Sequence, residues 1–192
     1  MLISALLLQS STIEMASASE CFQTEFPAPV KDGVLQFSSV NGQPTWYYLH
    51  WVQYQGISMG VCVLHEKPCK TFAESRRGPY CPLSNFGMNC IESMVVDSKV
   101  TVKNAIDPCS FLIFEKLRSI TISGNFDGII EPGENNILES LIINSGANFS
   151  GEILLDKCKK LETVQIDENS IAPGTTIKLP ADFSYIQQKL GH

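Results

Sequence analysis

The second half of the chain repeats a nine-residue pattern of apolar and polar positions. Positions one, four and six are apolar in each of four units, which begin at Ile91, Leu117, Leu138 and Leu161. The starts are separated by 26, 21 and 23 residues. Position three carries a small hydroxyl side chain throughout: Ser93, Ser119, Ser140 and Thr163. One such strand cannot bury its apolar side alone, so the pattern predicts parallel strands that stack in register.

Residues 34–64 carry a different pattern. Runs rich in β-branched and aromatic residues are interrupted at Asn41-Gly42 and again at Gln55-Gly56. Such interruptions predict strands joined by turns, here a small antiparallel β-meander. Residues 65–90 are irregular and contain cysteines, which is typical of a cap or connector. The fold class we predict is therefore mainly β, with the meander leading into a short solenoid.

The two ends of the chain carry further signals. The apolar run of residues 2–8, followed by small residues 16–18, predicts a secretory signal peptide over residues 1–18 and hence a secreted protein. Near the other end, Phe183, Ile186 and Leu190 fall on one face of a short helix. Such a helix would cover the last rung of a solenoid. We therefore divide the chain into residues 1–18, a meander and cap over 19–90, and a solenoid with its capping helix over 91–192.

Charge and length narrow the classes of function. The 192 residues are 44% apolar, and 20 acidic side chains face 14 basic ones. No basic block is present, which disfavours nucleic-acid binding. No later stretch is long and apolar enough to predict a membrane span.

The cysteines favour an oxidising compartment. Their spacings match no paired zinc motif, so we expect no metal site, and disulfides fit better. Six of the seven lie in the first 109 residues, namely Cys21, Cys62, Cys69, Cys81, Cys90 and Cys109. Six cysteines allow about 15 pairings. The one pairing we predict is the short loop that joins Cys81 to Cys90.

The stretch NFSGEILLDKCKKLETVQIDEN, residues 148–169, resembles the repeat of plant-type extracellular leucine-rich-repeat proteins. A Gly-x-Ile element of that family has counterparts at residues 128–130 and 151–153, without the proline that follows it in the family. Cys158 matches an inward-facing cysteine, which implies a buried free thiol. The resemblance covers residues 81–180. Surface-antigen repeats of bacteria and protists share the Cys-x-x-Leu element and are the second choice.

Position nine of these repeats is an asparagine that satisfies backbone groups where the chain leaves the strand. Asn125 and Asn169 occupy this position, whereas Lys99 and Gly146 replace it in the first and third units. The resemblance therefore implies looser turns after the first and third strands.

Leucine-rich repeats bind their ligands through the outward positions of their strands. The resemblance thus implies a non-catalytic extracellular recognition module that binds a protein or peptide and needs no cofactor. Positions two, five and seven would carry the contacts: Glu92, Arg118, Glu139, Glu162, Val95, Thr121, Ile142, Gln165, Asp97, Ser123, Asn144 and Asp167. This surface is acidic and rich in hydrogen-bonding groups, so a basic or mixed ligand would suit it.

Two alternatives stay open. A secreted carbohydrate-binding protein would use the aromatic cluster of Trp46, Tyr47, Tyr48, Trp51 and Tyr54 as a stacking platform. A β-helix polysaccharide-cleaving enzyme would use carboxylates that project from the rungs. Asp97 and Asp167 are the candidates, but three strand spacings separate them by about 14 Å, beyond the reach of a two-carboxylate glycosidase. We expect no catalytic residues.

Asn148 opens the chain's one N-glycosylation sequon, Asn-Phe-Ser. It is a candidate modification site in a secreted protein. His50 and His65 lie outside the repeated units, and we expect them to be ordinary core or surface residues.

The cysteine pattern is directly testable. Peptide mass mapping without reduction, on protein from a secretory host, is expected to yield a cross-linked peptide that joins Cys81 to Cys90. Recovery of both residues as free thiols would contradict the pairing and the predicted oxidising compartment together.

Overall fold

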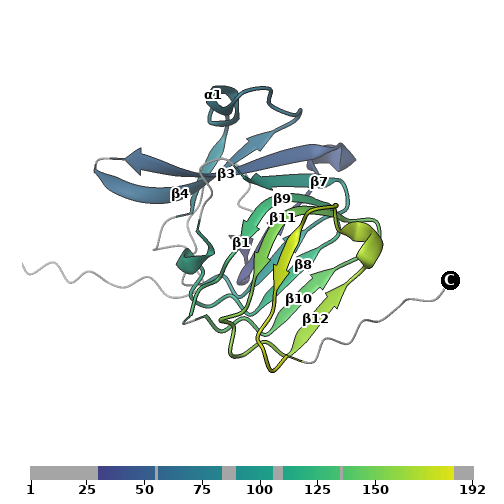
Figure 1. Cartoon of the computed structure of the whole chain (residues 1–192). Helices are drawn as coiled ribbons and strands as arrows, with labels where there is room; N and C mark the ends of the chain where they lie inside the picture. Colours follow the sequence, from purple (N-terminus) through teal and green to yellow (C-terminus); the bar gives the residue numbers. More distant parts are fainter. Residues whose placement is uncertain (1–29, 55, 84–89, 106–109, 135, 184–192) are drawn as a thin grey trace, which may run out of the picture.

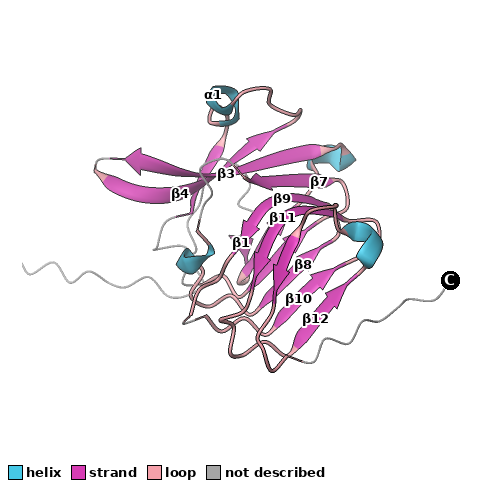
Figure 2. Cartoon of the chain, viewed as in Figure 1, coloured by secondary structure: helices cyan, strands magenta, loops and turns pink. Residues whose placement is uncertain are grey.

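A computed structural model describes residues 30–183, except for 55, 84–89, 106–109 and 135 (Figure 1). Two β-sheets contain all of the strands in this part of the chain (Figure 2). Sheet A contains, in spatial order, β1 (Val30–Lys31), β2 (Val34–Phe37), β6 (Ser93–Val96), β8 (Ser119–Ile122), β10 (Ser140–Ile143) and β12 (Thr163–Ile166). Sheet B contains β13 (Thr176–Lys178), β11 (Asn148–Leu154), β9 (Asn125–Ile130), β7 (Val100–Asn104), β3 (Thr45–Tyr54), β4 (Ile57–His65) and β5 (Tyr80–Leu83).

The chain winds between the sheets as a parallel β-solenoid. Each coil gives one strand to sheet A and the next to sheet B, as β6 and β7 do, and strands of successive coils pair in parallel. Short helical turns accompany the coils: η1 (Val40–Gly42), η2 (Phe111–Ile113) and η3 (Glu168–Ser170). The predicted mainly-β solenoid of parallel strands is confirmed.

The predicted register of the repeated units is also confirmed. Ser93 pairs with Ser119, Ser119 with Ser140, and Ser140 with Thr163. Positions four and six are buried in all four units, and position one is buried in three of them and half-buried in the last, at Leu161. The four units are therefore rungs of one ladder.

The core lies between the two sheets. Its largest fully buried side chains include Phe37, Phe126 and Phe149. Phe126 and Phe149 are partners in the β9–β11 register, and their rings stack 5.4 Å apart at an interplanar angle of 3°. Apolar side chains of successive coils thus form continuous columns, which is how a solenoid buries its core.

The antiparallel pairing predicted within residues 34–64 holds for β3 and β4. β5 pairs with β4 as a further antiparallel strand, in a segment that the sequence predicted to be irregular. The first expected hairpin is wrong, because β2 and β3 lie in different sheets and pair in parallel with β6 and β7. Asn41 and Gly42 do adopt left-handed φ values of 50° and 69°. They turn the chain around a solenoid corner, since both neighbouring strands find partners in the next coil.

Both sheets contain strands from each side of the predicted boundary between residues 90 and 91. The division of the chain into domains stays a prediction. The long β3–β4 hairpin projects beyond the stack (Figure 1). The predicted signal peptide and most of the predicted C-terminal helix lie outside the described residues. Phe183, the last described residue, packs partly buried against the core.

Glycines permit the close approach of successive coils. A Cβ on Gly124 would lie 2.2 Å from the Asp97 carbonyl oxygen and 2.4 Å from that of Val100. Gly128 and Gly151 are in register in sheet B, and a Cβ on Gly151 would lie 2.2 Å from the Gly128 carbonyl oxygen. The Gly-x-Ile elements therefore mark points where backbone packs directly on backbone.

Replacing Gly124 with alanine is expected to lower the unfolding free energy by about 3 kcal/mol or more, because fixed backbone oxygens block the methyl group. The matched control is Gly146→Ala. Gly146 has a φ of 82° but nothing within 4 Å of the added atom, so only the roughly 1–2 kcal/mol of backbone strain applies. Urea denaturation measures both, and equal losses would contradict the close packing at Gly124.

Candidate functional site

The outer face of sheet A carries the twelve predicted contact residues in three columns. Ladder hydrogen bonds extend past the strand ends, so positions two and seven stay in register as well: Glu162 N–H donates to Glu139 O at 2.8 Å, and Asp167 N–H donates to Ile143 O at 3.1 Å. All twelve side chains are exposed or half-buried. The structure thus brings these residues together on one surface, which we call the sheet A face.

The sheet A face is acidic. Five of its twelve residues are Asp or Glu and one is Arg. Arg118 forms an ion pair with Glu139 on the neighbouring rung. The remaining carboxylates leave an excess of negative charge on a flat surface, which attracts basic partners and repels acidic ones.

Polar side chains on and beside the sheet A face are held by their neighbours on adjacent rungs. The Ser93 and Ser119 hydroxyl oxygens lie 2.8 Å apart, within hydrogen-bond distance. Asn144 Nδ2 donates to Ser123 Oγ at 2.9 Å. Such contacts fix side chains before a ligand arrives, which lowers the entropic cost of binding.

Asp97 and Asp167 are not brought together. They follow the first and last of four successive strands, so three spacings of about 4.8 Å lie between them. Asp97 accepts from Gln36 Nε2 at 3.3 Å, and Asp167 accepts from Ser170 Oγ at 2.9 Å. Among the described residues, no group of three His, Cys, Asp or Glu side chains is arranged to hold a metal ion.

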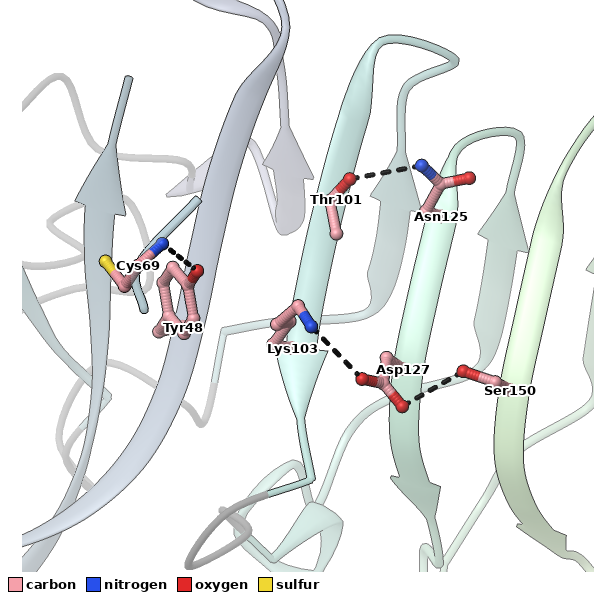
Figure 3. Close-up of polar contacts among 7 residues, drawn as sticks. All are labelled: Tyr48, Cys69, Thr101, Lys103, Asn125, Asp127 and Ser150. Atoms are coloured by element: carbon pink, nitrogen blue, oxygen red, sulfur yellow. Dashed lines mark hydrogen bonds and ion pairs between the residues drawn. The ribbon is translucent and has the colours of Figure 1, made fainter. Parts of the chain in front are cut away.

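Residues 66–79, which include α1 (Phe72–Ser75), cover part of the outer side of sheet B. The backbone N–H of Cys69 donates to the Tyr48 hydroxyl at 2.7 Å (Figure 3). His50 Nε2 lies 3.1 Å from Ser75 Oγ, and both residues are 2% exposed. The sequence predicted a cap or connector over residues 65–90, and residues 66–79 are the part that we call the cap. Its contacts with sheet B join residues 21 to 25 positions apart, so no local pattern predicts them.

The buried Ser75–His50 contact is structural. Ser75 Oγ donates its proton to the Phe72 carbonyl oxygen at 2.8 Å. The hydroxyl therefore meets the imidazole as an acceptor, and His50 Nε2 donates to it. Because both side chains are shielded from solvent, a substrate has no access to this pair, whose effect is to hold α1 against sheet B.

The aromatic cluster is split by the sheet. Tyr47 points into the main core, where its ring meets Phe37 edge-on at 5.1 Å, and burial raises the pKa of Tyr47 to about 12. Tyr48 lies under the cap and is 5% exposed. Trp46 and Trp51 are half-buried, and the side chain of Tyr54 lies outside the described residues. A continuous stacking platform is therefore not formed.

A network of hydrogen-bonded polar side chains lies on the outer side of sheet B (Figure 3). Asp127 accepts from Lys103 Nζ at 3.4 Å on one side and from Ser150 Oγ at 3.0 Å on the other. Asn148, the predicted glycosylation site, is exposed at the start of β11. Its use as a glycan acceptor stays a prediction.

The position-nine asparagines lie at the surface, and the role that the resemblance implied for them stays a prediction. Asn125 is exposed at the start of β9, and its Nδ2 donates to Thr101 Oγ1 at 3.1 Å (Figure 3). Asn169 is exposed within η3. Gly124 explains the first case, because the tight corner that it permits places the next residue at the start of the sheet B strand.

Cys158 is an inward-facing free thiol, as the resemblance implied, and is 2% exposed. Burial is the main reason that its pKa rises to about 11. Cys90 is disulfide-bonded, but its partner lies outside the described side chains. The side chain of Cys81 also lies outside the described side chains, so the predicted pairing with Cys90 stays a prediction.

Comparisons with protein-family models, with curated proteins and with solved structures find no match to this chain. Among the described residues, no helix is long and apolar enough to cross a membrane.

Burial of the Cys158 thiol predicts a pH-dependent stability. The folded-state pKa, about 11, lies above the usual value of 9.0. The folded protein therefore holds a proton that the unfolded chain releases, so this stabilisation is complete below pH 9 and is lost between about pH 9 and 11. The slope approaches about 1.4 kcal/mol per pH unit in this range.

Urea denaturation at several alkaline pH values, with Cys158→Ala as the comparison, tests this expectation. The alanine variant is less stable at neutral pH because of the cavity, and its stability falls less steeply above pH 9. Parallel curves for the two proteins would show that burial does not raise the pKa of the Cys158 thiol.

Proposed function

We propose that this protein is a non-catalytic extracellular recognition module that binds a protein or peptide through the sheet A face. The observation that carries the proposal is the strict register of the four rungs. Register turns isolated outward side chains into columns, and columns present an extended surface that fits a macromolecule better than a small molecule.

The chemistry of the surface defines the ligand. Excess carboxylates favour a ligand with Lys or Arg side chains, because complementary charge speeds encounter and rejects acidic competitors. Val95 and Ile142, both half-buried, offer apolar contacts within the position-five column. A basic segment with one or two apolar side chains therefore fits best.

Within repeat proteins, we favour the plant-type leucine-rich-repeat class, with surface-antigen repeats second. Support comes from the aligned Gly128 and Gly151 and from the buried Cys158. The exposed Asn125 and Asn169 depart from the class pattern. Secretion rests on the expected signal peptide, and a polysaccharide-cleaving role is disfavoured by the wide separation of Asp97 and Asp167.

The proposal predicts that peptides selected from a displayed random library on the immobilised protein are enriched in Lys and Arg. The double charge reversal Glu139→Lys with Glu162→Lys is expected to weaken their binding at least about tenfold, since it removes about 1.4 kcal/mol or more of attraction. Binding should also weaken as salt rises. Biolayer interferometry on the selected peptides measures both effects.

Glu152→Lys is the matched control, because Glu152 is exposed in β11 on sheet B and lies outside the sheet A face. It changes net charge in the same direction and should weaken binding far less. Peptides that bind the double variant as well as the original chain would place the binding surface elsewhere.

A further inference from the structure

A hollow of about 430 Å³ lies at the corner between β2 and β3, beside the start of the cap. Asn41, Gln43, Pro44, Trp46 and Glu66 line it. Its volume falls within the range of about 300–1,000 Å³ that is typical of small-molecule sites. The hollow shares no residue with the sheet A face.

The corner that forms one wall is held rigidly. The Thr45 hydroxyl accepts from the Val40 N–H at 2.9 Å and donates to the Gln43 carbonyl oxygen at 3.0 Å. Lys99 Nζ donates to the Gly42 carbonyl oxygen at 2.9 Å, which ties the corner to the next coil. Thr45 itself is 1% exposed. The amide side chains of Asn41 and Gln43 therefore project from a fixed backbone.

The pairing of β3 with β4 places the residues on the opposite side of the hollow. Trp46 is the register partner of His65 in β4, and Glu66 follows His65 directly. This places a half-buried indole and an exposed carboxylate at the same edge of the hollow. One aromatic residue, two residues with amide side chains and one with a carboxylate therefore line a single space.

We propose that this hollow binds a neutral saccharide residue. The indole offers a flat apolar surface for the C–H face of a pyranose, because aromatic side chains combine a large apolar area with defined geometry. Amide and carboxylate groups donate to and accept from neighbouring hydroxyl groups. The Glu66 carboxylate repels acidic sugars, which selects for a neutral ring.

An organic cation is the competing ligand, since an indole and a carboxylate also attract ammonium groups. Recognition of quaternary ammonium typically uses a cage of several aromatic faces. Among the described residues, Trp46 is the only aromatic one that lines this hollow, and the two amides give a cation no added attraction. The lining therefore favours the saccharide.

The test uses the full chain and the methyl glycosides of glucose, galactose, mannose and N-acetylglucosamine, with choline as the cationic probe. Saturation-transfer NMR detects binding, and titration gives affinity. At least one glycoside is expected to bind, with the strongest transfer to ring C–H protons. Trp46→Ala should weaken that binding about tenfold or more.

Control variants separate the site from the rest of the molecule. Trp51→Phe, on the same strand, should leave glycoside binding unchanged, while Trp46→Phe retains part of it. Asn41→Gly removes one amide at a position whose φ of 50° suits glycine, and it should weaken binding severalfold. Each variant is compared with the original chain by urea denaturation, so that loss of fold is not mistaken for loss of the site.

Glu66→Gln distinguishes the two chemistries. A saccharide tolerates the amide with a severalfold loss, because the amide still bonds to hydroxyl groups, whereas a cation loses its counter-charge. The proposal is overturned if no glycoside binds, if binding survives Trp46→Ala, or if choline binds and the glycosides do not. Peptide binding to the sheet A face is measured on the same variants and should not change, so the two proposals fail or stand separately.

Discussion

The stacked coils of this molecule depend on parallel pairing between their successive strands. A single rung such as β8 has a buried side only because β6 and β10 flank it, and its backbone groups are satisfied by the same neighbours. Stability is therefore shared along the stack, as expected where each unit contacts only its neighbours. The aligned columns follow directly from this constraint, because in-register pairing repeats each side chain's position from rung to rung.

Close coil-to-coil packing has a second consequence. The corners must turn within very few residues, and Gly124 meets this need where its neighbours' carbonyl oxygens leave no room for a side chain. The corner between β2 and β3, braced by Thr45, is longer and leaves space outside the stack. The tight corner at Gly124 thus allows successive coils to pack closely. The longer corner between β2 and β3 forms part of the hollow in which a saccharide is proposed to bind.

The part of the chain that departs from the repeat is organised by burial on the other side of sheet B. Tyr48, Val61 and Val63 form a small buried cluster beneath the cap, separate from the core between the sheets, and Cys69 of the cap packs against it. An aromatic run that looks uniform along β3 is consequently divided among a core residue, a residue under the cap and a half-buried Trp46. Alternation across a strand decides which ring faces which environment.

The amino-acid sequence by itself determined the sheet A rungs and their register, because apolar positions one, four and six can be buried in only one phase. It did not predict the strands β9 and β11 of sheet B. Each of them contains a glycine and follows a corner of a different length, so their apolar positions do not recur at a fixed spacing. Whether Asn41 and Gly42 close a hairpin or turn a corner was decided by tertiary pairing, as both outcomes need the same backbone angles. The cap and the hollow beside Trp46 likewise depend on residues far apart in the chain, and no local pattern encodes their meeting.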